Sequence, residues 1–185
     1  MKGFHRENLR FSLCGLNCGL CPMHLNRNCP GCGGGEGNQS CAIAACSLQH
    51  GAVAFCFQCT EFPCEKYAHI DDFDSFITHR NQKADLEKAK RIGIDAYCAE
   101  QAEKSELLNF LLSNYNDGRR KNLFCIAVNL LDTAEIKRIL RQLSAHTELN
   151  SAALKEKAAY AAALFQDAAN QHGMEWKLRK KASRP

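Results

Sequence analysis

The sequence has no long apolar run, and this absence argues against a membrane protein. No stretch reaches the roughly 18 consecutive apolar residues that a transmembrane helix needs. Residues 1–10 also lack the apolar segment of a secretory signal peptide. We therefore expect a cytoplasmic protein without membrane contact. In that reducing compartment thiols stay free and structural disulfides are rare.

Signatures of enzymes are lacking too. The sequence has no serine–histidine–aspartate arrangement and no paired carboxylates that stand out from the background. The glycine run Gly33–Gly35 lacks the lysine and the preceding strand of a phosphate-binding loop. The sequence therefore identifies no catalytic or cofactor-binding residue, and it leaves open whether the protein is an enzyme.

A concentrated basic surface is the third absence. The net charge is +4 over 185 residues, which is far from the clustered positive charge typical of nucleic-acid-binding domains. Arg119, Arg120 and Lys121 form one local group of cations, and the tail Lys177–Arg184 forms another. We expect the first to be a solvated helix start and the second a frayed end. Binding to nucleic acid is therefore the weakest hypothesis.

Cysteine is the residue present in excess. The chain has 12 cysteines, and ten of them lie between residues 14 and 64. Thiolates at this density in a reducing compartment are typical of metal sites, so we predict that all ten are metal ligands. They are Cys14, Cys18, Cys21, Cys29, Cys32, Cys41, Cys46, Cys56, Cys59 and Cys64. The other two, Cys98 and Cys125, lie on apolar helical stretches and are expected in the core.

The spacings within this segment indicate more than one centre. Cys14-x3-Cys18-x2-Cys21-Pro22 can present three thiolates to zinc or to an iron–sulfur cube. Two C-x2-C pairs, at Cys29/Cys32 and Cys56/Cys59, are typical of zinc knuckles. We predict one centre formed by Cys29, Cys32, Cys56 and Cys59. The other centre would take Cys14, Cys18, Cys21 and one of Cys41, Cys46 or Cys64.

Zinc is the predicted metal, with two ions per chain, because closed tetrathiolate sites suit the knuckle pairs. The protein would then have a structural or regulatory role, with a protein partner. The alternative is an iron–sulfur redox protein or enzyme, which the Cys14–Pro22 triplet favours. Residues 14–37 are rich in glycine and proline, so metal ligation is expected to supply much of their folding free energy.

The predicted fold is mainly α, with a small irregular cysteine-rich and metal-stabilised module at residues 1–72 and a helical region at 73–185. The two parts are expected to pack as one compact unit. Apolar periodicity and capping residues predict helices at 41–50, 81–116 with a break at Gly93, 119–131, 133–143 with Asp132 as N-cap, and 150–171. A further short helix is predicted to begin near Pro63.

Three cysteine blocks together resemble a known family. They read CGLNCGLCPM, CPGCGGGEGNQSCAIAACSLQHG and FCFQCTEFPCEKY. In order and spacing they resemble the prokaryotic cysteine-rich family named domain of unknown function 3795. The resemblance implies a cytosolic zinc- or iron–sulfur-binding domain with no established activity. The metal-ligand candidates that the resemblance implies are Cys14, Cys18, Cys21, Cys32, Cys41, Cys46, Cys59 and Cys64, with Cys29 and Cys56 as further candidates.

Overall fold

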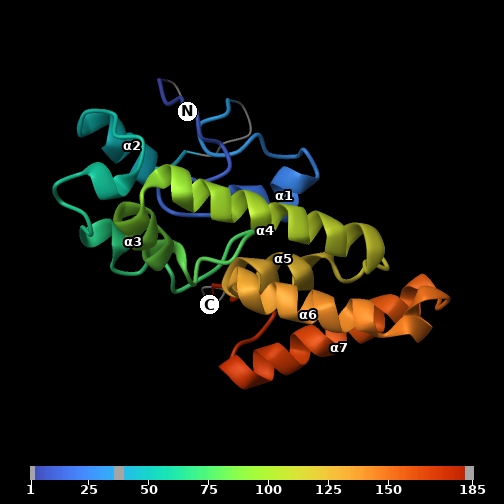
Figure 1. The fold of residues 1–185 in the computed structure, drawn as a ribbon. Helices are drawn as coiled ribbons and strands as arrows, with labels where there is room; N and C mark the ends of the chain where they lie inside the picture. The colour runs from blue at the N-terminus through green and yellow to red at the C-terminus, as the bar shows by residue number, and fades with distance from the viewer. Residues whose placement is uncertain (1–2, 36–39, 182–185) are drawn as a thin grey trace. The chain divides into compact units, whose positions relative to one another are not determined.

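The computed structural model describes residues 3–35 and 40–181, and within these ranges the chain is mainly helical (Figure 1). They hold seven α-helices and four short 3₁₀ turns but no β-strand, which confirms the predicted fold class. None of these helices is long and apolar enough to cross a membrane. Contacts divide the chain into two compact units. The first runs to Gln101 and resumes at Leu178, and the second is Ala102–Lys177.

Helices are few and short in the first unit until the chain leaves the cysteine-rich segment. In order they are α1 (Pro22–Leu25), α2 (Ala42–Gln49), α3 (Gln82–Ile92) and the beginning of α4 (Ile94–Asn114). Gly51, with φ of +78°, follows the C-cap of α2, as predicted for the helix at 41–50. Gly93, with φ of +89°, separates α3 from α4 at the predicted break. The helix predicted near Pro63 is only the 3₁₀ turn Glu65–Tyr67.

An aromatic cluster forms the core of the first unit. The ring of Phe11 lies 4.5 Å from that of Tyr97 and 5.5 Å from that of Phe55, measured between centroids. Leu86 and Ala89 of α3 are fully buried in the same cluster. The cysteine-rich segment therefore packs on α3 and on the first turns of α4.

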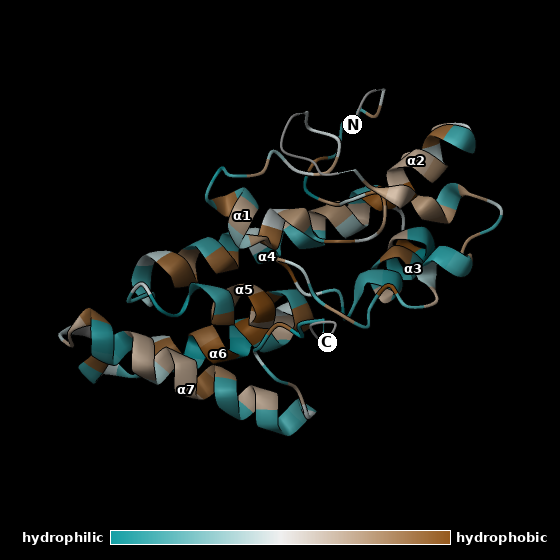
Figure 2. Cartoon of the chain, turned by 180° about the vertical axis from the view of Figure 1, so that it is seen from behind, coloured by the Kyte–Doolittle hydropathy of each residue, from teal (hydrophilic) through white to brown (hydrophobic). Residues whose placement is uncertain are grey.

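In the second unit, the later part of α4 is followed by α5 (Lys121–Leu130), α6 (Thr133–Ala145) and α7 (Leu154–His172). Asp132 caps α6 as predicted, because its carboxylate accepts a hydrogen bond of 2.7 Å from the backbone N–H of Glu135. Residues 124–130 of α5 are all buried, and most of this helix is hydrophobic in Figure 2. The Phe124 ring packs edge-on against Phe165 of α7. This unit is an ordinary helical core.

The division between the units lies inside α4. The cysteine-rich module is predicted to end at residue 72. By its contacts, the cysteine-rich segment forms one unit with α3 and the start of α4. The physical reason is that Leu86, Ala89 and Tyr97 carry the apolar surface on which the segment is buried.

Candidate metal centre

All twelve cysteines are free thiols, and eight of the ten in the cysteine-rich segment fall into two sets. The first thiol cluster consists of Cys14, Cys18, Cys32 and Cys41. Cys32 and Cys41 lie close enough to Cys14 for their ionised forms to raise its pKa, and Cys14 and Cys32 are placed likewise beside Cys18. Cys21 adjoins this cluster through Cys18, and Cys29 adjoins it through Cys21.

Two tight turns bring the first thiol cluster together. The 3₁₀ turn Cys18–Leu20 follows a turn in which Ser12 N–H donates to Leu16 O over 2.8 Å. The second turn is Cys29-Pro30-Gly31-Cys32, where a Cβ on Gly31 would lie only 2.3 Å from Leu9 O. This close approach requires glycine and holds Cys32 beside the residues that precede Cys14. Contact with the Cys32 backbone lowers the pKa of Cys18 against the effect of burial, so these two cysteines lie side by side.

The electrostatics of the first thiol cluster disfavour free thiolates. The pKa of the Cys14 thiol is raised to about 11, mainly by burial. The hydrogen bond with Ser12 lowers this pKa, whereas negative charge on Cys32 or Cys41 raises it. Burial likewise raises the pKa of Cys18 well above its usual value, with Cys32 and Cys14 adding to the effect. Four negative sulfurs here would repel one another, and a bound cation would reverse that repulsion.

The second thiol cluster consists of Cys46, Cys56, Cys59 and Cys64. These four residues line one cavity of about 30 Å³. Cys46 comes from α2, Cys56 from the 3₁₀ turn Cys56–Gln58, and Cys64 from the N-cap of the turn Glu65–Tyr67. The pKa of Cys56 is raised to about 12, mainly by burial. Interaction with Tyr67 lowers this pKa, whereas negative charge on Cys14, Cys64 or Cys46 raises it.

A histidine and a tyrosine border the second thiol cluster. His50 Nδ1 lies 3.5 Å from Cys46 Sγ and 2.9 Å from Cys46 O, while its Nε2 lies 3.5 Å from Glu61 Oε1. Its nearest polar contact is thus the helix carbonyl rather than the sulfur. Tyr67 lines the same cavity, and its hydroxyl donates to Cys14 O over 3.4 Å. Both residues support the cluster from outside the set of thiols.

The arrangement differs from the predicted grouping. Cys56 and Cys59 lie with Cys46 and Cys64, whereas Cys32 lies with Cys14 and Cys18. In the described part of the chain, no three histidine, cysteine, aspartate or glutamate side chains converge tightly enough to hold a single ion. The thiol chemistry fits zinc or an iron–sulfur cluster, but the sulfurs of either set would have to draw inward around it.

A family model matches the cysteine-rich part of the chain. Residues 10–69 match the family model described as protein of unknown function (DUF3795). The match confirms the resemblance seen in the cysteine blocks, and we call residues 10–69 the DUF3795 segment. Both thiol clusters lie entirely within it. No curated protein and no solved structure matches the chain significantly.

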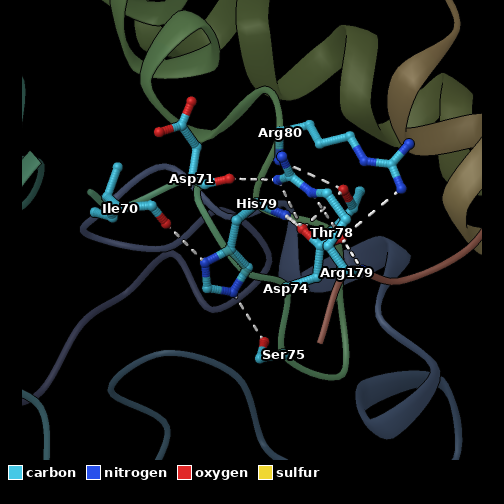
Figure 3. Close-up of polar contacts among 8 residues, drawn as sticks. All are labelled: Ile70, Asp71, Asp74, Ser75, Thr78, His79, Arg80 and Arg179. Carbon is cyan, nitrogen blue, oxygen red and sulfur yellow. Dashed lines mark hydrogen bonds and ion pairs between the residues drawn. The ribbon is translucent and has the colours of Figure 1, made fainter. Parts of the chain in front are cut away.

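A polar network beyond the DUF3795 segment was missed by the sequence analysis (Figure 3). The fully buried side chain of Asp74 accepts hydrogen bonds from the backbone N–H of His79 and of Arg179, both 2.8 Å long. The Arg179 guanidinium lies 3.2 Å from Asp74 Oδ1, and Arg80 lies 3.8 Å from Oδ2. The tail is therefore anchored at Arg179, which corrects the expectation that residues 177–181 fray; residues 182–185 lie outside the described ranges.

Hydrogen bonds, together with the charge of Arg179, explain how the Asp74 carboxylate can be buried. Burial would raise the pKa of its carboxyl, but the hydrogen bonds from Arg179 and from the His79 N–H outweigh it, so the pKa is lowered. His79 completes the loop, with Nδ1 3.1 Å from Ile70 O and Nε2 3.0 Å from Ser75 Oγ. This network closes the loop that links the cysteine-rich segment to α3.

Proposed function

We propose that the DUF3795 segment is a metal-binding module in which each thiol cluster holds one zinc ion, and that the protein has a structural or regulatory role. The observation that carries the proposal is the second thiol cluster, because four cysteines from three separate elements line one small cavity. Zinc sites of this kind are closed by four thiolates. The ligands would be Cys46, Cys56, Cys59 and Cys64 in the second cluster. In the first they would be Cys14, Cys18, Cys32 and Cys41.

The electrostatics support the same proposal. Burial and like-charged neighbours raise the thiol pKa values of Cys14, Cys18 and Cys56, so each cluster resists ionisation without a cation. Zinc binds thiolate and thereby displaces the protons. A reducing cytosol, which we also propose as the location, would keep these thiols available.

An iron–sulfur cluster is the second candidate, and it would occupy the first thiol cluster. It is favoured by the neighbouring positions of Cys14, Cys18 and Cys21, which precede Pro22 as cluster ligands often do. Such a cluster would give the module a redox role instead of a purely structural one.

Metal analysis of protein purified without oxygen tests both candidates. We expect two zinc ions per chain and no visible absorption. Cys32→Ser should remove one ion and Cys59→Ser the other, because each variant opens a different cluster. Cys98→Ser is the matched control, since Cys98 lies outside both clusters and should leave two ions bound. Iron, acid-labile sulfide and visible absorption lost in Cys32→Ser would favour the iron–sulfur candidate. Zinc content that neither variant changes would contradict the proposal.

A further inference from the structure

Ser75 and His79 form a hydrogen-bonded pair on the loop between the DUF3795 segment and α3 (Figure 3). The distance from Ser75 Oγ to His79 Nε2 is 3.0 Å, and the other ring nitrogen, Nδ1, lies 3.1 Å from Ile70 O. A carbonyl oxygen only accepts hydrogen bonds, so Nδ1 of the neutral ring carries the proton. Nε2 is then the acceptor, and the Ser75 hydroxyl donates to it.

This order of donors and acceptors is that of an activated nucleophile. In such a site a hydroxyl donates to a base, and a third group orients the base from its other side. Here the orienting group is Ile70 O, and a sequence search misses the pair because this third member is a backbone carbonyl. Ser144 differs, because its hydroxyl donates to Leu140 O over 3.0 Å and a carbonyl does not take up the proton.

The loop holds the pair in place through backbone hydrogen bonds. The buried carboxylate of Asp74, which precedes Ser75, accepts a hydrogen bond of 2.8 Å from the backbone N–H of His79. Ser75 N–H donates to Ile77 O over 3.1 Å, and Arg179 N–H donates to Asp74 from the tail over 2.8 Å. The hydroxyl and the ring are therefore positioned before any substrate arrives, which is a condition for efficient reaction.

The pair lies on a solvent-exposed part of the loop with apolar side chains nearby in the sequence. Ser75 is itself exposed. Two phenylalanines of the same loop are exposed as well, Phe73 by 41% and Phe76 by 66%. Aromatic side chains left in water gain free energy when an apolar group covers them, so they favour a reagent with an apolar chain.

We propose that Ser75 is a nucleophile that takes an acyl group from an ester with an apolar acyl chain, and that His79 is its general base. In this step Ser75 Oγ attacks the carbonyl carbon of the ester, and its proton moves to His79 Nε2. The bond from that carbon to the leaving alcohol then breaks, and the alcohol departs with the proton. One acyl-Ser75 and one alcohol are formed, with no change of oxidation state.

Labelling of the full-length protein with a hexyl fluorophosphonate tests the proposal. Ser75 Oγ would attack the phosphorus atom of this reagent and displace fluoride, while the serine proton goes to His79. We expect one adduct per chain, which peptide mass spectrometry assigns to Ser75. Ser75→Ala should abolish it, whereas the matched control Ser144→Ala should leave it unchanged. Protein unfolded in urea should give no adduct, because the orienting contacts are then lost.

His79→Ala tests the base. General-base catalysis typically contributes 10²- to 10⁴-fold, so labelling of Ser75 should slow at least about 100-fold. Imidazole added to the solution should restore part of the rate, which a purely structural role of His79 does not predict. His69→Ala is the matched control, since this histidine pairs with Asp72 instead of a serine.

The preference for an apolar chain is tested with a methyl fluorophosphonate. The hexyl reagent should react about tenfold faster, the effect of burying roughly two methylene groups against the exposed rings. Phe76→Ser should reduce this advantage. Equal rates for the two reagents in wild-type protein would overturn the assignment of an apolar donor.

The wild-type protein decides the central question whatever the variants do. If folded wild-type protein forms no adduct at Ser75, the inference is overturned. Equal labelling rates in wild-type protein and in folded His79→Ala would overturn the role of His79. If that variant does not fold, His79→Asn replaces it, because an amide N–H in place of Nδ1 keeps the hydrogen bond to Ile70 O and removes the base.

This inference does not depend on the proposed metal sites, because neither member of the pair is a cysteine. Zinc measured on the same wild-type sample separates the two. Two zinc ions without an adduct at Ser75 would overturn the inference alone. An adduct at Ser75 on protein that binds no metal would overturn the proposed function alone.

Discussion

Gly15→Ala tests how closely the cysteine-rich loop lies against α3. A Cβ atom at this position would lie 2.2 Å from the carbonyl oxygen of Gln82 and 2.8 Å from Cγ of Leu86. Carbon and oxygen atoms do not approach this closely, so the loop between Cys14 and Cys18 would have to move away from the helix. Gly15 also has φ of +97°, a conformation that L-residues rarely adopt.

Two costs therefore add in Gly15→Ala. The backbone conformation costs about 1–2 kcal/mol, and displacement of the packed loop costs about 1–3 kcal/mol more. We expect the free energy of unfolding to fall by about 3 kcal/mol in total. Gly51→Ala is the matched control in the same unit. It has φ of +78° and nothing within 4 Å of its Cβ position, so it should cost only about 1 kcal/mol.

Urea unfolding of the metal-loaded protein, followed by far-ultraviolet circular dichroism, measures both variants. The denaturant midpoint should shift at constant slope, because neither change alters the surface exposed on unfolding. Equal losses for the two substitutions would show that the loop is not in close contact with α3, and the reasoning would be refuted.

Three other substitutions test separate parts of the fold. Tyr97→Phe removes a 3.0 Å hydrogen bond to Asn17 and should lower the free energy of unfolding by about 1 kcal/mol in urea titrations. The lowered pKa of Asp74 means that its stabilisation is present above pH 4 and is lost as pH falls below it. Unfolding free energy measured against pH should therefore show an acid-dependent component that Asp74→Asn lacks. Asp132→Ala removes a helix cap, and calorimetry should show a loss of about 1 kcal/mol.

The helices were predictable because their signals are local. Gly93 and Gly51 end helices through backbone conformations that glycine favours, and Asp132 begins one through its own side chain. Each of these signals lies within a few residues of the feature that it determines. The resemblance to the family could be predicted for the same reason, because it depends on cysteines at short spacings along the sequence.

The grouping of the cysteines was not predictable, because it depends on how the chain returns in space. Spacing suggested that the pairs at Cys29 and Cys56 share a metal, yet the turn at Gly31 directs Cys32 toward Cys14. One available signal lay in α2. Cys41 is the N-cap of α2 and Cys46 lies five residues further on, a spacing that does not bring two side chains to one face of a helix, and the two adjoin different clusters. Asp74 and Arg179 are 105 residues apart and carry no sequence signal at all.

The buried aromatic residues change what metal removal is expected to do. The composition of residues 14–37 predicted that metal ligation supplies much of the folding free energy of that stretch. The segment is in fact anchored by Phe11, Leu13, Leu20, Phe55 and Tyr67, each 6% exposed or less.

Burial of one such side chain stabilises a fold by about 1.5–3 kcal/mol, so the proposed metal ligation would add to substantial apolar packing. Chelation should therefore lower the melting temperature of the module while its near-ultraviolet aromatic dichroism persists in the cold. Loss of that dichroism on chelation at low temperature would instead show that the apolar core cannot hold the segment without its metal.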